Sequence, residues 1–177
     1  MKTLKYIIIL ISYFSLSASS CKKDKTGIDA LPAATQEGRN TFGCLVNGEV
    51  FSLKRQGLGP LFQCYYTNYQ QEGYYFKLSA YSDNKGYDKT IVLSSDSLKL
   101  EENKIYNLGL PNILGDTAAE YIYTTPNFYI VKDKRGQLKI TKLDEIKRII
   151  SGTFWFDAVN EAGEKVEVRE GRFDMKY

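Results

Sequence analysis

The chain has 177 residues, of which 43% are hydrophobic and 25% charged, a composition typical of one globular domain rather than of a disordered chain. Without Lys2 and Lys5, which lie in the leader described below, 22 basic residues face 21 acidic ones, and a net charge of +1 gives no electrostatic footprint for nucleic acid. The sequence has no histidine, which excludes Ser-His-Asp and Cys-His catalysis and HExxH metalloprotease sites. We expect neither a cofactor nor a metal centre.

Residues 1–20 are typical of a secretory signal peptide, in which lysines precede an apolar stretch over residues 6–16 and small residues follow it. The apolar stretch is too short for a membrane-spanning helix, which needs about 20 residues. The small residues end at Cys21 in the sequence ASSC, which resembles the lipobox of bacterial lipoproteins, in the relaxed form of the Bacteroidota. This resemblance implies acylation of Cys21 and a lipid anchor in the outer membrane, on either its periplasmic or its cell-surface side. The alternative is an ordinary signal peptide with an incidental cysteine.

Residues 21–37 lack any hydrophobic period and contain Gly27 and Pro32, so we expect a flexible linker ahead of a domain over residues 38–177. The charged residues 22–25 resemble the tags that send some Bacteroidota lipoproteins to the outer face of the membrane. The alternative is that these charges belong to a solvated tether.

The stretch 41–53 predicts a β-hairpin, because apolar residues lie on both sides of Asn47-Gly48, the preferred pair of a two-residue turn. This register pairs Val46 with Glu49 and Cys44 with Phe51. Further strands are predicted at 74–82, 89–95, 127–132 and 136–143, the last two as the arms of one hairpin. Residues 96–106 and 143–150 are the two stretches that could hold a helical turn.

The C-terminal stretch predicts a second hairpin, whose three-residue loop places Gly163 in the left-handed conformation. The register then sets Phe156 against Val168 and Ala158 against Val166. The apolar face changes parity across Gly171, which predicts a β-bulge. Together these strands predict an all-β domain, an antiparallel β-sandwich or barrel of about eight strands.

Three stretches, at residues 31–51, 140–144 and 148–177, resemble small Bacteroidota lipoproteins that carry a domain of unknown function. The resemblance implies a secreted, lipid-anchored, β-rich domain. It assigns no catalytic residue.

Cys44 and Cys64 are an even pair, and an oxidising compartment would allow them to form a disulfide. Closing a loop of about 20 residues would stabilise the fold by roughly 3 kcal/mol in the chain-entropy model. The alternatives are two buried free thiols, or a metal or redox role.

Residues 64–76 contain five tyrosines. As a ligand-binding surface, they would offer Tyr65, Tyr69 and Tyr75 as sugar-stacking platforms, with Asn68 and the neighbouring glutamines Gln70 and Gln71 as hydroxyl partners. The alternative is that these tyrosines cover the edge of the core, because tyrosine has high β propensity and can bury its ring while its hydroxyl group faces water.

A histidine-free hydrolase would need paired carboxylates. Asp157 and Glu167 are expected to be neighbours across the C-terminal hairpin, beside Trp155 on the solvent face. Two pairs of adjacent acids, Glu101-Glu102 and Asp144-Glu145, are further candidates.

These observations favour a lipid-anchored protein of the cell envelope that is not an enzyme and that binds a glycan or a neighbouring envelope protein. The alternative function is a carboxylate-dependent glycan hydrolase.

Overall fold

The computed structural model describes residues 26–54, 58–84, 87–123, 128–130 and 135–177, and these are mostly β-structure. The expected signal peptide and the lipidation residue Cys21 lie outside the described residues. In chain order the elements are the 3₁₀ turn η1 (Gly27–Ala30) and the strands β1 (Thr41–Val46), β2 (Glu49–Val50), β3 (Phe62–Tyr69), β4 (Gly73–Asn84), β5 (Tyr87–Ser95), β6 (Ile105–Gly109), β7 (Thr117–Tyr123), β8 (Phe128–Ile130), β9 (Gly136–Asp144), β10 (Ile149–Val159) and β11 (Lys165–Lys176).

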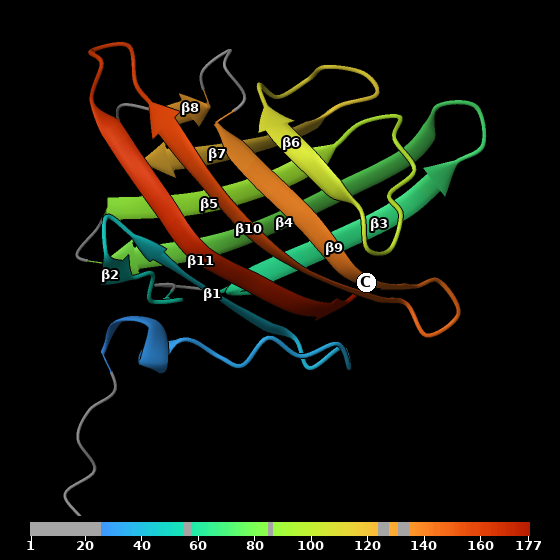
Figure 1. Ribbon diagram of the computed structural model, residues 1–177, viewed down its shortest axis with the longest axis horizontal. Helices are drawn as coiled ribbons and strands as arrows, with labels where there is room; N and C mark the ends of the chain where they lie inside the picture. The colour runs from blue at the N-terminus through green and yellow to red at the C-terminus, as the bar shows by residue number, and fades with distance from the viewer. Residues whose placement is uncertain (1–25, 55–57, 85–86, 124–127, 131–134) are drawn as a thin grey trace, which may run out of the picture.

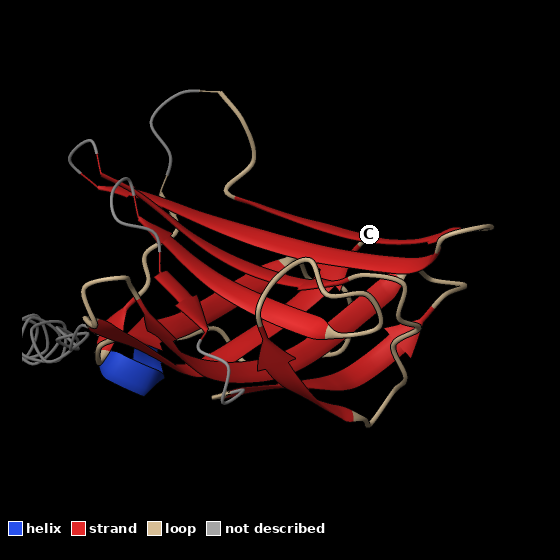
Figure 2. Ribbon diagram, turned by 90° about the horizontal axis from the view of Figure 1, so that it is seen from above, coloured by secondary structure: helices blue, strands red, loops and turns tan. Residues whose placement is uncertain are grey.

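The described strands form one sheet in the order β2-β1-β11-β10-β9-β6-β7-β5-β4-β3, and β8 pairs with β10 and β7 beside this path. The sheet is bent into two layers that cross each other obliquely (Figures 1 and 2). The front layer holds β1, β11, β10, β9 and β6, and the back layer holds β7, β5, β4 and β3. The sheet is not closed, because β2 and β3 are its two ends.

The hydrophobic core lies between the two layers. Phe76 of the back layer stacks on Phe173 of the front layer with 6.2 Å between ring centroids, and Phe42 stacks on Phe154 within the front layer at 5.7 Å. Each such aromatic pair adds about 0.5–1.5 kcal/mol beyond the area that it buries. Buried side chains alternate with outward-facing ones in β6 and in the first half of β9, as the pleat requires.

The hairpins predicted over residues 41–53 and at the C-terminus are confirmed. Val46 pairs with Glu49, and the amide of Phe51 donates to the carbonyl of Cys44 over 3.0 Å. The turn residues Asn47 and Gly48 both have positive φ, at 50° and 82°, which the two-residue turn demands.

In the C-terminal hairpin, Phe156 pairs with Val168, Ala158 pairs with Val166, and Gly163 has a φ of 82°. The predicted bulge is also present. Between the pairs Phe154–Gly171 and Phe156–Val168, two residues of β11 face one residue of β10. The bulge residues are therefore Arg169 and Glu170, directly before Gly171, and they lie opposite Trp155.

The finer prediction of an antiparallel sandwich or barrel of about eight strands needs correction. The sheet is mixed, since β6 and β7 are parallel, and it is neither closed nor split into two separate sheets. It also has more strands than expected. Residues 105–109 fall partly in a stretch predicted as a helical turn, and β7 contains Ala118 and Ala119, which have low β propensity.

The hairpin predicted between residues 127–132 and 136–143 is wrong. In the described residues, β8 pairs with β10 and β7, whereas β9 pairs with β10 and β6. Sequence neighbours can be separated in this way because the bend brings the ends of the two layers together, and β8 joins them there.

Residues 31–39, named the strap here, lie along the domain rather than free of it, unlike the flexible linker expected over 21–37. Leu31 is buried, and a Cβ built on Gly43 of β1 would lie 2.5 Å from Cδ of Pro32. The strap is held by the buried carboxylate of Asp174 on β11, which accepts hydrogen bonds from Thr35 Oγ1 (2.6 Å), Ser151 Oγ (2.7 Å) and the amides of Glu37 (3.0 Å), Gly38 (2.7 Å) and Arg39 (3.1 Å). A buried carboxylate needs such donors, and here the strap supplies most of them.

Candidate functional site

Three of the predicted platform residues share the outer face of the back layer. Tyr65 and Tyr69 lie four residues apart on β3, and Tyr75 of β4 pairs with Thr67 between them, so all three side chains point to the same side. Tyr65 is 54% exposed and Tyr69 is 55% exposed, whereas Tyr75 is half-buried. These three residues are named the tyrosine surface.

The other residues of this stretch have different places. Tyr66 points into the core, where it stacks on Tyr74 at 5.3 Å and its hydroxyl accepts a hydrogen bond from the amide of Leu100. Burial raises the pKa of Tyr66 far above its usual value of 10. Asn68 pairs with Tyr74 and so projects from the opposite side of the strand, which means that it does not join the tyrosine surface as predicted.

A hollow of about 360 Å³ adjoins the tyrosine surface, lined by Tyr69, Tyr75 and the acidic residues Glu72 and Asp96 among others. In the pairing of β3 with β4, the cation nearest to these tyrosines is Lys77, which lies opposite Tyr65. The positive charge of Lys77 also interacts with the carboxyl group of the half-buried Glu120. The two charged residues that line the hollow are therefore both acidic.

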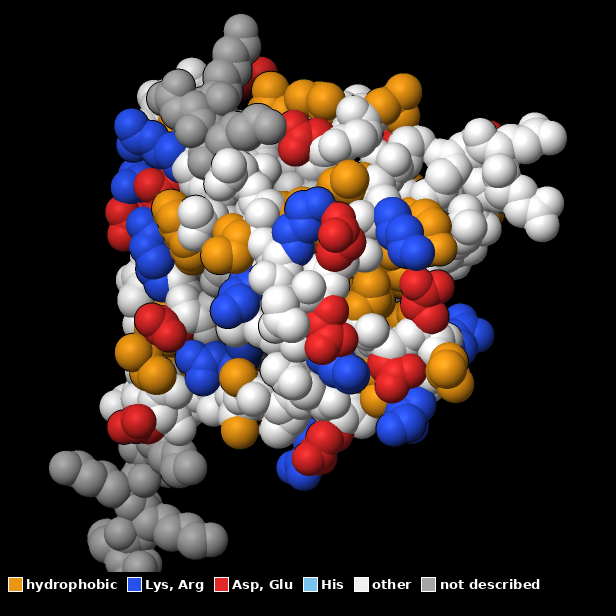
Figure 3. Space-filling view, turned by 45° about the vertical axis from the view of Figure 1, so that its right-hand side comes forward, with side chains coloured by type: hydrophobic (Ala, Val, Ile, Leu, Met, Phe, Trp, Pro, Cys, Tyr) orange, Lys and Arg blue, Asp and Glu red, His pale blue; other side chains and the backbone are white. Residues whose placement is uncertain are grey.

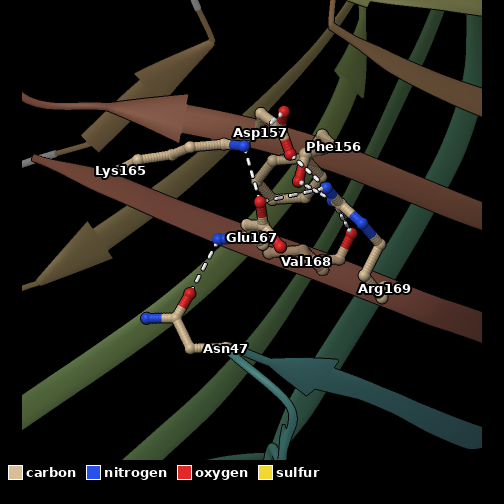
Figure 4. Close-up of polar contacts among 7 residues, drawn as sticks. All are labelled: Asn47, Phe156, Asp157, Lys165, Glu167, Val168 and Arg169. Carbon is tan, nitrogen blue, oxygen red and sulfur yellow. Dashed lines mark hydrogen bonds and ion pairs between the residues drawn. The ribbon is translucent and has the colours of Figure 1, made fainter.

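The predicted acidic pair is also brought together, because Asp157 and Glu167 are directly opposite on β10 and β11. Both carboxylates form ion pairs with basic side chains of β11 (Figure 4). Arg169 lies 2.5 Å from Asp157, and Lys165 lies 3.1 Å from Asp157 and 2.5 Å from Glu167.

These contacts decide the protonation of the acidic pair. Burial raises the pKa of Asp157, but hydrogen bonds from Arg169 and Lys165 outweigh it, and the net pKa is lowered. A hydrogen bond from Lys165 lowers the pKa of Glu167 as well. Both groups are thus carboxylates at neutral pH, whereas a general acid of a glycosidase needs a raised pKa. We assign to Asp157 and Glu167 the role of holding Arg169 in position.

Arg169 reaches from this cluster over the ring of Trp155, with 5.4 Å between the guanidinium carbon and the ring centroid. Trp155 is 38% exposed and forms part of a groove of about 620 Å³ on the outer face of the front layer, named the Trp groove. Its lining comes from the strap, β6, β9, β10 and β11: Ala34, Ile105, Gln137, Lys139, Thr153, Phe154, Trp155, Arg169, Glu170, Gly171 and Arg172.

The Trp groove follows the register of the sheet. One row of paired residues crosses four strands, from Ile105 through Lys139 and Thr153 to Arg172. Gln137 lies opposite Trp155 in the next outward-facing row. Sequence reasoning named Trp155 but missed the others, since their alignment depends on which strands are neighbours.

The cationic side chains Lys139, Arg169 and Arg172 line the groove, against the single carboxylate of Glu170. Glu170 pairs with Arg172 at 3.3 Å, and no described residue forms an ion pair with Lys139. Figure 3 shows that positive and negative side chains are interspersed over one face of the molecule. In the lining of the groove, three cationic side chains accompany one carboxylate.

The two cysteines of the described residues are free thiols, Cys44 in the core of the front layer and Cys64 half-buried on β3. Burial raises the pKa of both thiols, that of Cys64 to about 12, so neither is a reactive thiolate at neutral pH. The disulfide between them stays a prediction for an oxidising compartment.

The part of the chain that the structure describes holds no group of three or more histidine, cysteine or acidic side chains placed to bind a metal ion. No helix in it has the length and apolarity required to cross a membrane.

Comparisons with known proteins leave the function open. No curated protein and no solved structure matches this chain. Residues 64–175, more than half of the chain, match the model of a family described as a domain of unknown function, DUF6252. The matched range holds the tyrosine surface, the acidic pair and all of the Trp groove except Ala34 of the strap. The protein therefore belongs to the DUF6252 family.

Proposed function

We propose that this protein is a non-enzymatic binding protein of the bacterial cell envelope, anchored by lipid at Cys21, whose tyrosine surface binds neutral carbohydrate. The observation that carries the proposal is the exposure of Tyr65 and Tyr69 on the same outer face as Tyr75. A monomeric domain gains nothing in stability from exposed aromatic rings, and grouped exposed rings are typical of binding surfaces.

The chemistry of the surroundings supports a neutral sugar. Tyrosine rings offer flat apolar faces to the C–H face of a sugar, and the neighbouring carboxylates of Glu72 and Asp96 are strong acceptors for hydroxyl groups. The same carboxylates would repel an acidic ligand. The expected occupant is therefore an uncharged oligosaccharide.

The anchor is supported by residues 1–21, in which a short apolar segment ends in small residues and a cysteine. Metabolic labelling with a fatty acid tests it. The wild-type protein should take up label, and Cys21→Ser should not. A labelled Cys21→Ser variant would contradict the anchor and leave the binding proposal untouched. Protease shaving of intact cells would then show which side of the outer membrane the domain faces.

The binding proposal is tested by calorimetry of the purified mature protein with neutral oligosaccharides of glucose, mannose and xylose. Tyr69→Ala should weaken binding by roughly fivefold or more, since an aromatic stacking contact is worth about 1–3 kcal/mol. Ile146→Ala is the matched control, because Ile146 is a more exposed large apolar side chain in the turn between β9 and β10. No binding of any of these sugars, or equal affinity of the two variants, would contradict the proposal.

A further inference from the structure

The Trp groove differs from the tyrosine surface in layer, shape and charge, and the proposed function leaves it unused. It is concave, its lining includes the aromatic residues Phe154 and Trp155, and it brings amide, hydroxyl and cationic side chains toward the same space. Such a concave site with a few convergent polar groups is what small-ligand sites have in common. We infer that the Trp groove is a second binding site, specific for an acidic saccharide, a chain that contains uronic acid residues.

The charge of the groove selects an anion. Arg169 is committed to the carboxylate of Asp157, and Arg172 is paired with Glu170. Lys139 remains without a counter-ion among the described residues and is exposed in the centre of the row formed with Ile105 and Thr153. A ligand carboxylate beside Lys139 would balance this charge.

The other groups select a saccharide among anions. Trp155 and Ile105 offer apolar surface for the C–H face of a sugar ring, which an inorganic anion cannot use. Gln137 and Thr153 lie opposite Trp155 and Lys139, and their amide and hydroxyl groups both donate and accept hydrogen bonds, as sugar hydroxyls require. The acidic cluster on β10 and β11 holds Arg169 in place beside Trp155.

Specific contacts between the strap and the sheet also fix the shape of the groove. The strap supplies Ala34 as one wall, and its position is held by four hydrogen bonds that it donates to Asp174. Pro32 of the strap fits against Gly43, at the end of the row that begins at Ile105, and a Cβ on Gly43 would collide with it. The wall therefore has a fixed place relative to Lys139 and Trp155 before any ligand arrives.

Trp155 is the single tryptophan of the chain, so its fluorescence reports on this groove alone. The full mature protein in detergent is titrated with oligomers of galacturonate and of alginate, and with fully methyl-esterified oligogalacturonate as the uncharged match. We expect at least one acid oligomer to change the fluorescence in a saturable way, and the methyl ester to bind about tenfold more weakly. Added salt should weaken the binding of the acid oligomer, because the groove and the ligand carboxylates are open to solvent.

Two pairs of variants assign the contacts. Lys139→Gln should weaken binding of the acid oligomer about three- to fivefold, as expected for an exposed ion pair, whereas Lys147→Gln in the β9–β10 turn should not change it. Ala34→Glu places a negative charge on the wall and should weaken binding by a similar factor. Ala34→Gln, of the same size, should weaken it less.

The inference is overturned if neither acid oligomer affects Trp155, or if the acid and its methyl ester bind equally well. Polyphosphate or an oligothymidine that binds more tightly than both acid oligomers would also overturn it, since neither contains a sugar acid. Equal affinities of Lys139→Gln and Lys147→Gln would remove the charge contact on which the inference rests. None of these outcomes depends on the tyrosine surface, which is tested with neutral sugars.

Discussion

The tyrosine surface and the Trp groove both present aromatic side chains from the outer face of a sheet layer, but their neighbours have opposite charges. Glu72 and Asp96 lie beside Tyr69 and Tyr75, whereas Lys139, Arg169 and Arg172 lie around Trp155. The two regions also differ in support. The tyrosine surface is formed by two adjacent strands, while the groove needs four strands and the strap.

Under the two proposals, exposed aromatic side chains form the binding surfaces, and the charged residues beside them decide the ligand class. The net charge of the chain conceals the contrast, because it averages over both regions. The comparison also predicts unequal sensitivity to mutation. Changes that disturb the strap or the packing beneath the groove should affect Trp155 and leave the tyrosine surface intact.

The largest effect is expected for Gly152→Ala, which would disturb the packing of β10 beneath the groove. A Cβ at this position would lie 2.6 Å from the carbonyl oxygen of Lys139 and 2.7 Å from the ring of Phe173. Since one of these contacts is backbone, we expect the free energy of unfolding to fall by about 3 kcal/mol in urea denaturation.

Gly115→Ala is the comparison for this change. Gly115 has a φ of 75° but open space around its Cβ position, so its cost should be only about 1 kcal/mol. Equal losses for the two variants would show that the close approach at Gly152 is not what limits the sheet.

Asp174→Asn should release the strap and remove one wall of the Trp groove. Burial raises the pKa of Asp174, but hydrogen bonds from Thr35, Ser151 and the strap amides lower it to a net value of about 2, below its usual 3.8. Because the folded-state pKa is the lower one, the carboxylate stabilises the fold above about pH 4, and this stabilisation is lost as the pH falls toward 2.

At neutral pH we therefore expect Asp174→Asn to lower the free energy of unfolding by about 2 kcal/mol and to alter the fluorescence of Trp155. The variant should also lose stability less steeply than wild type between about pH 4 and 2. Asp29→Asn, at an exposed site in η1, is the control. An unchanged acid dependence in Asp174→Asn would refute the role assigned to this carboxylate.

The smallest effects should divide the tyrosine stretch by strand parity. Tyr66→Phe removes the hydroxyl that accepts from the buried amide of Leu100 and should cost about 1–2 kcal/mol of unfolding free energy. Tyr65→Phe removes an exposed hydroxyl and should stay within about 0.5 kcal/mol of wild type. Thermal denaturation of both variants checks this, and a reversed order would contradict the faces assigned to β3.

Parts of both candidate sites could be predicted from the sequence because hairpins are local. The outward-facing set Tyr65, Tyr69 and Tyr75 follows from alternation along two strands joined by a short turn, and the pairing of Asp157 with Glu167 follows from the loop at Gly163. Asn68 has suitable hydrogen-bonding groups, but its parity excludes it from the tyrosine surface. The basic side chains that pair with Asp157 lie on the partner strand β11. Their effect on the charge of Asp157 therefore depends on how side chains are placed across the hairpin.

The sequence by itself determined the all-β class, the registers of the hairpins at residues 41–53 and at the C-terminus, and the bulge before Gly171, since alternation and turn residues act over a few neighbouring positions. Only the tertiary structure decided that β6 joins β9 and runs parallel to β7, and that the strap lies on Asp174. These are contacts between distant parts of the chain, chosen by core packing and by the need of a buried carboxylate for donors. The Trp groove depends on these contacts, because β6 and the strap, which lie far from β10 and β11 in the sequence, complete its lining.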